Sequence, residues 1–159
     1  MLNIYVLEDH FIQQNRIEEV IHTILKKNNI KVGDFEVFDK PNQLLESITE
    51  RGSHQLFFLD IQIKDDTKKG LEVAKQIRKS DPYANIVFFT THSEYLPLTF
   101  QYQLAALDFI DKSLEGEDFQ KRLESIILLT CKKIQSQNPE DAFRIENAKT
   151  VIQVPFHDI

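Results

Sequence analysis

The sequence alternates between short apolar segments that favour β-strands and longer segments with apolar residues at helical spacing. The strand-type segments are 2–7, 35–38, 55–61, 85–90 and 106–110. Between them apolar residues recur every three or four positions, as at Ile17, Ile21 and Ile24, which is typical of a helix buried along one side. Strands that alternate with helices form right-handed crossovers and a parallel sheet with helices on both faces. The pattern therefore predicts an α/β fold.

Proline and glycine mark the ends of several predicted helices. Pro41 suits the first turn of a helix, and Gly52 follows its end. A weaker helix over residues 93–104 is interrupted early by Pro97. Five short strand–helix units predict a doubly wound, flavodoxin-like (βα)5 sheet of five parallel strands in the order 2-1-3-4-5, whose ligands lie outside the carboxyl ends of the strands.

Length, charge and cysteine content narrow the classes of function. A chain of 159 residues with 42% apolar residues can fill the core of one ordinary domain. The 25 acidic and 19 basic residues give a net charge of -6 without a long basic stripe, so we do not expect this chain to bind nucleic acid by itself. The single cysteine, Cys131, excludes a disulfide framework and fits a reducing compartment. Because no segment resembles a signal peptide or approaches the roughly 20 apolar residues of a membrane span, we expect a cytoplasmic protein.

Polar and charged residues stand where the predicted strands end. They are Glu8 and Asp9 after the first strand, Asp60 after the third, Thr90 and Thr91 after the fourth, and Lys112 after the fifth. Since the carboxyl ends of parallel strands meet at one edge of the sheet, we expect these side chains to share a small space.

The chemistry of this group points to a metal ion and a phosphoryl group. Two carboxylates about 4 Å apart repel by roughly 4 kcal/mol at an effective dielectric constant near 20, and a divalent cation removes that conflict. An all-oxygen site without His or Cys suits Mg²⁺ best. Lys112 adds a positive charge and Thr90 a hydroxyl donor, which fits a phosphoryl group. Asp60 stands alone at the middle of the edge, so we assign it the role of nucleophile.

Four motifs resemble those of the receiver domains of two-component response regulators. They are the acidic pair Glu8-Asp9, Asp60 in "FFLDI", Thr90 in "VFFTT" and Lys112 in "DFIDK". They occur in the order and spacing of that family, and the resemblance covers about residues 1–135.

The resemblance implies a role for each of these residues. Asp60 is the phosphoacceptor, Glu8 and Asp9 hold Mg²⁺ together with Asp60 and the backbone carbonyl of Gln62, Thr90 and Lys112 contact the phosphoryl group, and Phe109 and Thr91 change position on activation. It also implies a sensor histidine kinase as phosphoryl donor and catalysis limited to the chain's own phosphorylation and dephosphorylation.

Further segments are similar to the quorum-sensing regulators of streptococci and staphylococci that carry a LytTR DNA-binding domain. These segments are "LEDH", the long loop "DIQIKDDTKKG" and the closing "IQVPFHDI". The similarity implies a receiver domain over 1–135, a linker over 136–142 and, over 143–159, the start of a LytTR-type domain inside which the chain stops. Phosphorylation is then expected to favour a receiver homodimer that controls transcription, with DNA bound only through the C-terminal domain.

Three other readings of the sequence remain. A haloacid-dehalogenase-type phosphatase also uses an aspartate nucleophile after an apolar strand, but it needs a second acid two residues later, where this chain has Gln62. A receiver-like module that acts without phosphorylation would keep the fold but not the switch. A nucleotide-binding protein is disfavoured because the four glycines form no phosphate-binding loop. One departure from many receivers is Ser113, which follows Lys112 in place of proline, so a cis peptide bond is not assumed there.

Overall fold

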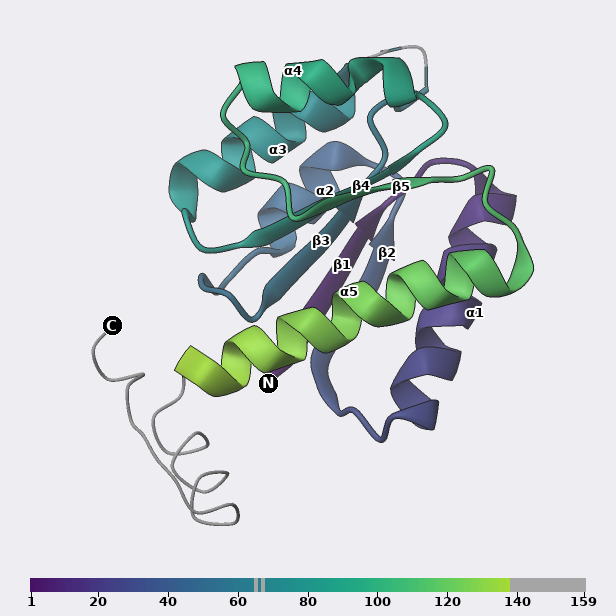
Figure 1. Cartoon of the computed structure of the whole chain (residues 1–159). Coiled ribbons are helices and arrows are strands. Elements are labelled where there is room, and N and C mark those ends of the chain that lie inside the picture. Colours follow the sequence, from purple (N-terminus) through teal and green to yellow (C-terminus); the bar gives the residue numbers. More distant parts are fainter. Residues whose placement is uncertain (65, 67, 138–159) are drawn as a thin grey trace.

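A computed structural model describes residues 1–64, 66 and 68–137 as a five-stranded parallel sheet between two layers of helices (Figure 1). The elements are β1 (Leu2–Leu7), α1 (Phe11–Lys27), β2 (Val32–Phe38), α2 (Pro41–Ser47), β3 (Gln55–Leu59), α3 (Lys69–Ser80), β4 (Asn85–Thr90), the 3-10 helix η1 (Ser93–Tyr95), α4 (Leu96–Gln101), β5 (Asp108–Asp111) and α5 (Gly116–Gln137). The strand order β2-β1-β3-β4-β5 confirms the predicted doubly wound, flavodoxin-like topology. In Figure 1, α1 and α5 cover one face of the sheet, and α2, α3 and α4 cover the other.

The apolar strand segments are explained by burial on both faces of the sheet. In β1, Ile4 and Val6 pack in the cluster that includes buried residues of α1 and α5, whereas Tyr5 and Leu7 pack in the cluster that includes α3. Successive side chains of a strand point to opposite faces. A central parallel strand therefore needs apolar residues at nearly every position.

The ends of several elements differ from those predicted. β2 begins at Val32, three residues earlier than the apolar segment 35–38, because an edge strand is only half-buried and can include polar residues. α2 ends at Ser47, before the predicted end near Gly52. The helix predicted over 93–104 is a 3-10 turn followed by α4, with Pro97 in the first turn of α4, where proline is tolerated.

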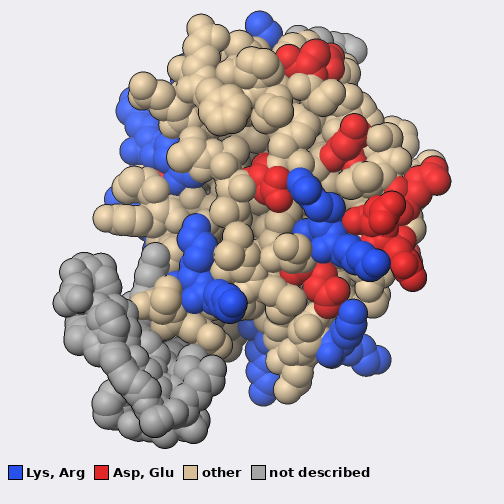
Figure 2. Space-filling model, in the orientation of Figure 1, with Lys and Arg blue, Asp and Glu red and all other residues tan. Residues whose placement is uncertain are grey.

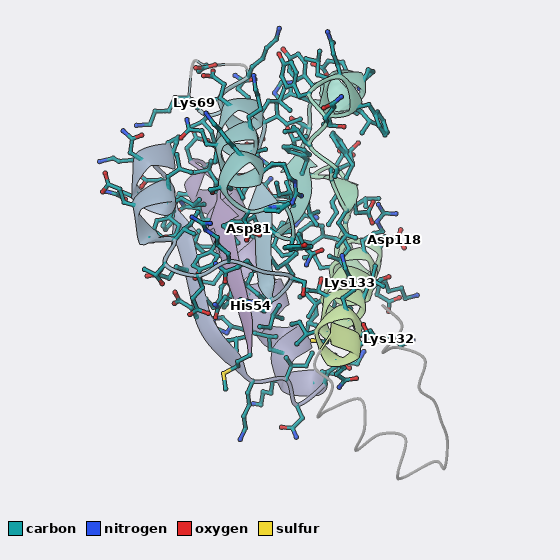
Figure 3. The ribbon with its side chains drawn as sticks, turned by 90° about the vertical axis from the view of Figure 1, so that its left-hand side faces the viewer. His54, Lys69, Asp81, Asp118, Lys132 and Lys133 are labelled. Atoms are coloured by element: carbon teal, nitrogen blue, oxygen red, sulfur yellow. The ribbon has the colours of Figure 1, made fainter. Side chains whose placement is uncertain are left out.

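The amino ends of the strands are closed by paired polar side chains. Asn3 Nδ2 donates to Gln55 Oε1 at 2.7 Å, and Asn85 Nδ2 donates to the Ser53 carbonyl at 2.7 Å. Lys133, labelled on α5 in Figure 3, donates from Nζ to Asn85 Oδ1 at 2.5 Å. The hydrogen-bonding capacity of these polar groups is therefore met by other groups of the chain.

The predicted linker and DNA-binding segment lie mostly outside the described residues. α5 continues through Gln137, so the first two residues assigned to the linker over 136–142 are helical. The remainder of that linker, and the predicted strands within 143–159, belong to the part that the structure does not describe. Among the described helices, none is long and apolar enough to cross a membrane.

Candidate functional site

Backbone hydrogen bonds extend the strand pairing beyond the strands and position the site residues. The N–H of Asp60 donates to the Leu7 carbonyl at 3.0 Å, and the N–H of Lys112 donates to the Thr90 carbonyl at 3.1 Å. The N–H of Glu8 likewise bonds to the last residue of β2. Each site residue therefore sits at a fixed register on the carboxyl edge of the sheet.

Three carboxylates meet at this edge, as the sequence predicts. One oxygen from each of Glu8, Asp9 and Asp60 lies within 4.8 Å of the others. Glu8 and Asp60 are buried, at 0% and 5% exposure, and Asp9 is half-buried. At such separations like charges repel by several kcal/mol unless a cation compensates them.

Lys112 supplies part of that compensation. Its Nζ lies 2.6 Å from Oδ2 of Asp60 and also forms an ion pair with Oε1 of Glu8. The Lys112 side chain is only 8% exposed, so this is a buried network rather than a solvent-screened surface pair. One ammonium group therefore faces two buried carboxylates.

Oδ1 of Asp60 is a buried carboxylate oxygen with no hydrogen-bond partner in the described structure. Oε1 of Glu8, by contrast, is in direct contact with the Lys112 ammonium. The other Glu8 oxygen, Oε2, accepts the N–H of His10 at 2.9 Å. Because an unpaired buried acceptor costs free energy, Oδ1 of Asp60 marks a place where a ligand can bind.

The pKa of Glu8 reflects the same shortage of positive charge. Burial raises this pKa above its ordinary value, and the negative charge of Asp60 raises it further. The hydrogen bond and the charge of Lys112, together with the N–H of His10, act in the opposite direction. Burial dominates these effects.

The cluster opens onto a pocket of about 330 Å³. Its lining includes six of the eight residues singled out from the sequence, namely Glu8, Asp9, Asp60, Gln62, Thr91 and Lys112. Three larger pockets lie on the outer side of α5, between α4 and β5, and between α3 and the segment after α4. The pocket of about 330 Å³ is the one lined by the three clustered carboxylates together with Lys112.

The other two predicted residues, Thr90 and Phe109, lie beside the pocket rather than in its lining. The Thr90 side chain is fully buried, and its hydroxyl oxygen accepts the N–H of His92 at 3.2 Å. Phe109 is half-buried, with its ring centroid 6.3 Å from that of Phe88. Phe109 lines the pocket of about 570 Å³ between α4 and β5 together with Phe100. Both residues are therefore close to elements of the site without facing its open space.

The loop that follows Asp60 is tied to the acidic pair. The N–H of Lys64 donates to Oδ2 of Asp9 at 2.8 Å, and Gln62 Nε2 donates to the Lys64 carbonyl at 3.3 Å. The N–H of Gly70, at the start of α3, donates to the Ile61 carbonyl at 2.7 Å. The described part of this loop is thus held to Asp9, two residues after β1, and to the start of α3.

Two residues at the site were not identified from the sequence. Gly70 packs so closely that a Cβ built on it would lie 1.7 Å from the Asp60 carbonyl oxygen. Arg16 of α1 donates to the carbonyls of Lys112 and Leu114. Gly70 could have been noted as one of only four glycines, whereas Arg16 gives no local signal because its partners lie 96 and 98 residues away.

The fold and this acidic edge are those of a signalling receiver domain. Residues 4–124 match the family described as "Response regulator receiver domain". The match covers more than half of the sequence, and the chain belongs to this family. No cis peptide bond occurs among the described residues, including the bond after Lys112.

Among characterised relatives the chain is similar to "Accessory gene regulator protein A" of staphylococci. It is 29% identical to that protein of Staphylococcus epidermidis (strain ATCC 12228 / FDA PCI 1200) over an alignment of 160 positions, gaps included, that covers 99% of this chain and 67% of the relative. It is 27% identical to that of Staphylococcus aureus (strain N315) over an alignment of 161 positions, again covering 99% of this chain and 67% of the relative.

Solved structures with the same fold are also receiver domains. The "BeF3 Activated DrrB Receiver Domain" aligns with a TM-score of 0.62 at 16% identity, covering 83% of this chain and 98% of that one. The response regulatory domain of protein mrkE from Klebsiella pneumoniae aligns with a TM-score of 0.64 at 21% identity, covering 86% and 100%. At these identities the likeness confirms the fold.

Proposed function

We propose that this chain is a phosphorylation-dependent switch in which Asp60 accepts a phosphoryl group from a sensor histidine kinase in the cytoplasm. The observation that carries the proposal is the buried Oδ1 of Asp60, which has no hydrogen-bond partner in the described structure while Lys112 holds Oδ2 of the same carboxylate. Oδ1 is thus available to attack phosphorus, and the new O–P bond forms as the N–P bond of the donor phosphohistidine breaks. Membership of the receiver family supports this assignment.

The acidic cluster fits a magnesium ion. Glu8, Asp9 and Asp60 offer carboxylate oxygens within 4.8 Å of one another, and neither histidine nor cysteine belongs to this set, which suits Mg²⁺ rather than a softer metal. Gln62 lines the same pocket, and we propose its backbone carbonyl as a further ligand. When bound, the ion would neutralise the carboxylates and the oxygens of an incoming phosphoryl group.

Lys112 and Thr90 are the proposed contacts of the transferred group. The Lys112 ammonium already lies against Asp60 and can pair with a phosphoryl oxygen. Thr90 ends β4 with its hydroxyl oxygen accepting a backbone N–H, so a small movement of the following residues, including the exposed Thr91, would turn this hydroxyl toward the site. The proposed chemistry is limited to phosphorylation of Asp60 and hydrolysis of the resulting aspartyl phosphate. The chain therefore acts as a switch rather than as an enzyme on other substrates.

The switch is proposed to act through the face formed by α4, β5 and α5. A phosphoryl group adds about -1.5 to -2 charges at Asp60, which favours the inward movement of Thr90. Phe109 lies beside the pocket between α4 and β5, and we propose that its ring changes orientation with the loop after β4. This face would then favour a homodimer of receiver domains.

DNA binding is assigned to the C-terminal segment rather than to the receiver. On the face shown in Figure 2, Lys and Arg side chains lie in separate patches with Asp and Glu between them, and the net charge is -6. Such a surface does not favour a DNA backbone. We therefore propose that residues 143–159 begin a LytTR-type domain through which dimerisation controls transcription.

The test is the intact mass of the protein after incubation with acetyl phosphate and Mg²⁺. We expect the unmodified protein to gain one phosphoryl group, and Asp60→Asn to gain none because the nucleophilic carboxylate is absent. Asp118→Asn, which alters an exposed aspartate in the first turn of α5, is the matched control and should be phosphorylated normally. A chelator should abolish the gain in every variant.

Three outcomes would contradict the proposal. Phosphorylation of Asp60→Asn to the same extent would place the acceptor elsewhere. The absence of both phosphorylation and any fluoroberyllate-induced change in the spectrum of backbone amides would favour an interaction module that works without phosphorylation. Steady turnover of a phosphomonoester would instead favour a phosphatase.

A further inference from the structure

Arg16 of α1 binds the loop that carries Lys112. Its Nη1 donates to the Lys112 carbonyl at 2.7 Å, and its Nη2 donates to the Leu114 carbonyl. The guanidinium carbon also lies 3.8 Å from the ring centroid of Phe119 on α5, within the range of a cation–π contact. Arg16 therefore joins α1, the loop between β5 and α5, and the first turns of α5.

This arrangement is specific to the fork-like geometry of arginine. Two carbonyls two residues apart are bound by the two terminal nitrogens of one guanidinium group, and the flat face of the group stacks on an aromatic ring. A lysine has one flexible ammonium and cannot reproduce this set of contacts. Arg16 is half-buried, so its hydrogen bonds are less exposed to competition from water than those of a surface arginine.

The loop has other restraints: the N–H of Lys112 donates to the Thr90 carbonyl at 3.1 Å, and Leu114 packs against the core cluster that includes α1 and α5. Residues 112–115 contain no proline to fix a backbone angle. The N–H groups of Ser113 and Leu114 both bond back to Asp111, through its side chain and its carbonyl respectively. These hydrogen bonds shape the turn but do not attach it to α1. Arg16 provides that attachment at the carbonyl of Lys112 itself.

The position of this carbonyl determines where the Lys112 ammonium can lie. The ammonium is at the end of a flexible four-carbon stem, yet it is held 2.6 Å from Asp60 Oδ2 and in contact with Glu8. We infer that Arg16 is a positioning residue that, by binding the carbonyls of Lys112 and Leu114, holds the Lys112 ammonium at the phosphoacceptor site. The effect on phosphoryl binding rests on the proposed function, whereas the effect on Lys112 itself does not.

The first readout is the environment of Lys112 without any phosphoryl donor. In protein labelled with ¹³C-lysine, the ¹³Cε–¹Hε signal of Lys112 is assigned by its loss in Lys112→Arg. We expect Arg16→Met, which removes the donors but keeps an apolar stem near Phe119, to shift this signal toward that of solvent-exposed lysines. Arg122→Met is the matched control, because Arg122 likewise donates to a backbone carbonyl, that of Phe109 in β5, but not to the Lys112 loop.

The second readout is the affinity for fluoroberyllate in the presence of Mg²⁺. Loss of an outer contact that orients a site residue typically weakens binding about tenfold, and we expect that loss in Arg16→Met but not in Arg122→Met. In a Lys112→Met background the same Arg16 change should alter the affinity by less than about twofold, because the group that Arg16 positions is already absent. Arg16→Lys should recover only part of the loss, and it replaces Arg16→Met in every measurement if the latter does not fold.

The outcomes separate this inference from the proposed function. Failure of the unmodified protein to bind fluoroberyllate would count against the switch, and the Lys112 signal would still decide the role of Arg16. An unshifted Lys112 signal in the Arg16 variant would overturn the inference. An effect on fluoroberyllate affinity that is equally large with and without Lys112 would also overturn it, because Arg16 would then act by another route.

Discussion

The Lys112 ammonium lies 2.6 Å from Oδ2 of Asp60, although 52 residues separate the two along the chain. The same ammonium also pairs with Glu8, so one cation stabilises two buried carboxylates. Removal of one member of a buried ion pair is far more costly than removal of an exposed one. Stability and the capacity to bind a metal ion are therefore coupled at this site.

Substitution of Lys112 should make the protein depend on Mg²⁺ for stability. In the presence of a chelator, Lys112→Met leaves Asp60 and Glu8 without their cation, and we expect a loss of about 3 kcal/mol in the free energy of unfolding. Mg²⁺ should restore part of this loss. Urea unfolding with and without Mg²⁺ measures both effects. Lys121→Met, at a lysine whose side chain is 74% exposed, should change stability by less than about 0.5 kcal/mol; equal losses in the two variants would contradict the buried network.

Gly70→Ala should disturb Asp60 through its backbone. A Cβ at this position would lie 1.7 Å from the Asp60 carbonyl oxygen and 2.7 Å from the Ile61 Cα, so the chain must shift. We expect a loss of about 1–3 kcal/mol in unfolding free energy, together with slower phosphorylation by acetyl phosphate. Gly116→Asn is the control, because a Cβ there meets nothing within 4 Å and asparagine tolerates the φ of +52°. Normal phosphorylation of a folded Gly70→Ala protein would show that Asp60 tolerates the shift.

Arg78 should contribute more to the free energy of unfolding than its neighbour Lys79. Arg78 donates from Nε to the Leu104 carbonyl at 2.9 Å, and from Nη1 to the carbonyls of Asp81 at 3.1 Å and Pro82 at 3.0 Å. The bond to Leu104 connects α3 to the segment that leads from α4 into β5, and the other two bind the turn that follows α3. We expect Arg78→Met to lower the free energy of unfolding by about 2 kcal/mol, with faster amide hydrogen exchange in that segment. Lys79→Met should have little effect, and a similar loss in both would argue against a specific role for these bonds.

The pH dependence of stability in alkali should report on Tyr5. Burial raises the pKa of Tyr5 to about 12, and the negative charge of Asp34, whose Oδ2 accepts the Tyr5 hydroxyl at 3.2 Å, adds to the rise. In the unfolded chain the pKa is near 10. Between about pH 10 and 12 the unfolded chain therefore binds fewer protons than the folded one, so this residue makes stability fall as the pH rises.

Comparison with Tyr5→Phe isolates that contribution from other groups that titrate in alkali. The variant should lose stability less steeply than the unmodified protein between pH 10 and 12, while the two curves run parallel below about pH 9. Denaturant unfolding at closely spaced pH values provides the measurement. Parallel curves across the whole range would mean that Tyr5 ionises in the folded protein as easily as in the unfolded chain.

The sequence by itself determined the architecture and the set of groups at the active edge. Apolar segments buried on both faces, such as 55–59 and 85–90, can be read locally because a central parallel strand needs apolar residues at nearly every position. The alternation with helices then determines the topology, and the topology brings Asp60 and Lys112 to the same edge. The meeting of the three carboxylates followed from this reasoning alone.

Only the tertiary structure decided the distances and the supporting contacts. The unpartnered Oδ1 of Asp60, the burial of Thr90 away from the pocket, and the close approach of Gly70 depend on how separate elements pack. The hydrogen bond from Arg16 to the Lys112 carbonyl joins residues 96 positions apart. Local sequence patterns indicate the periodicity and burial of a single segment. A hydrogen bond between distant segments depends instead on the relative positions of both segments, and these positions are set by the packing of the whole domain.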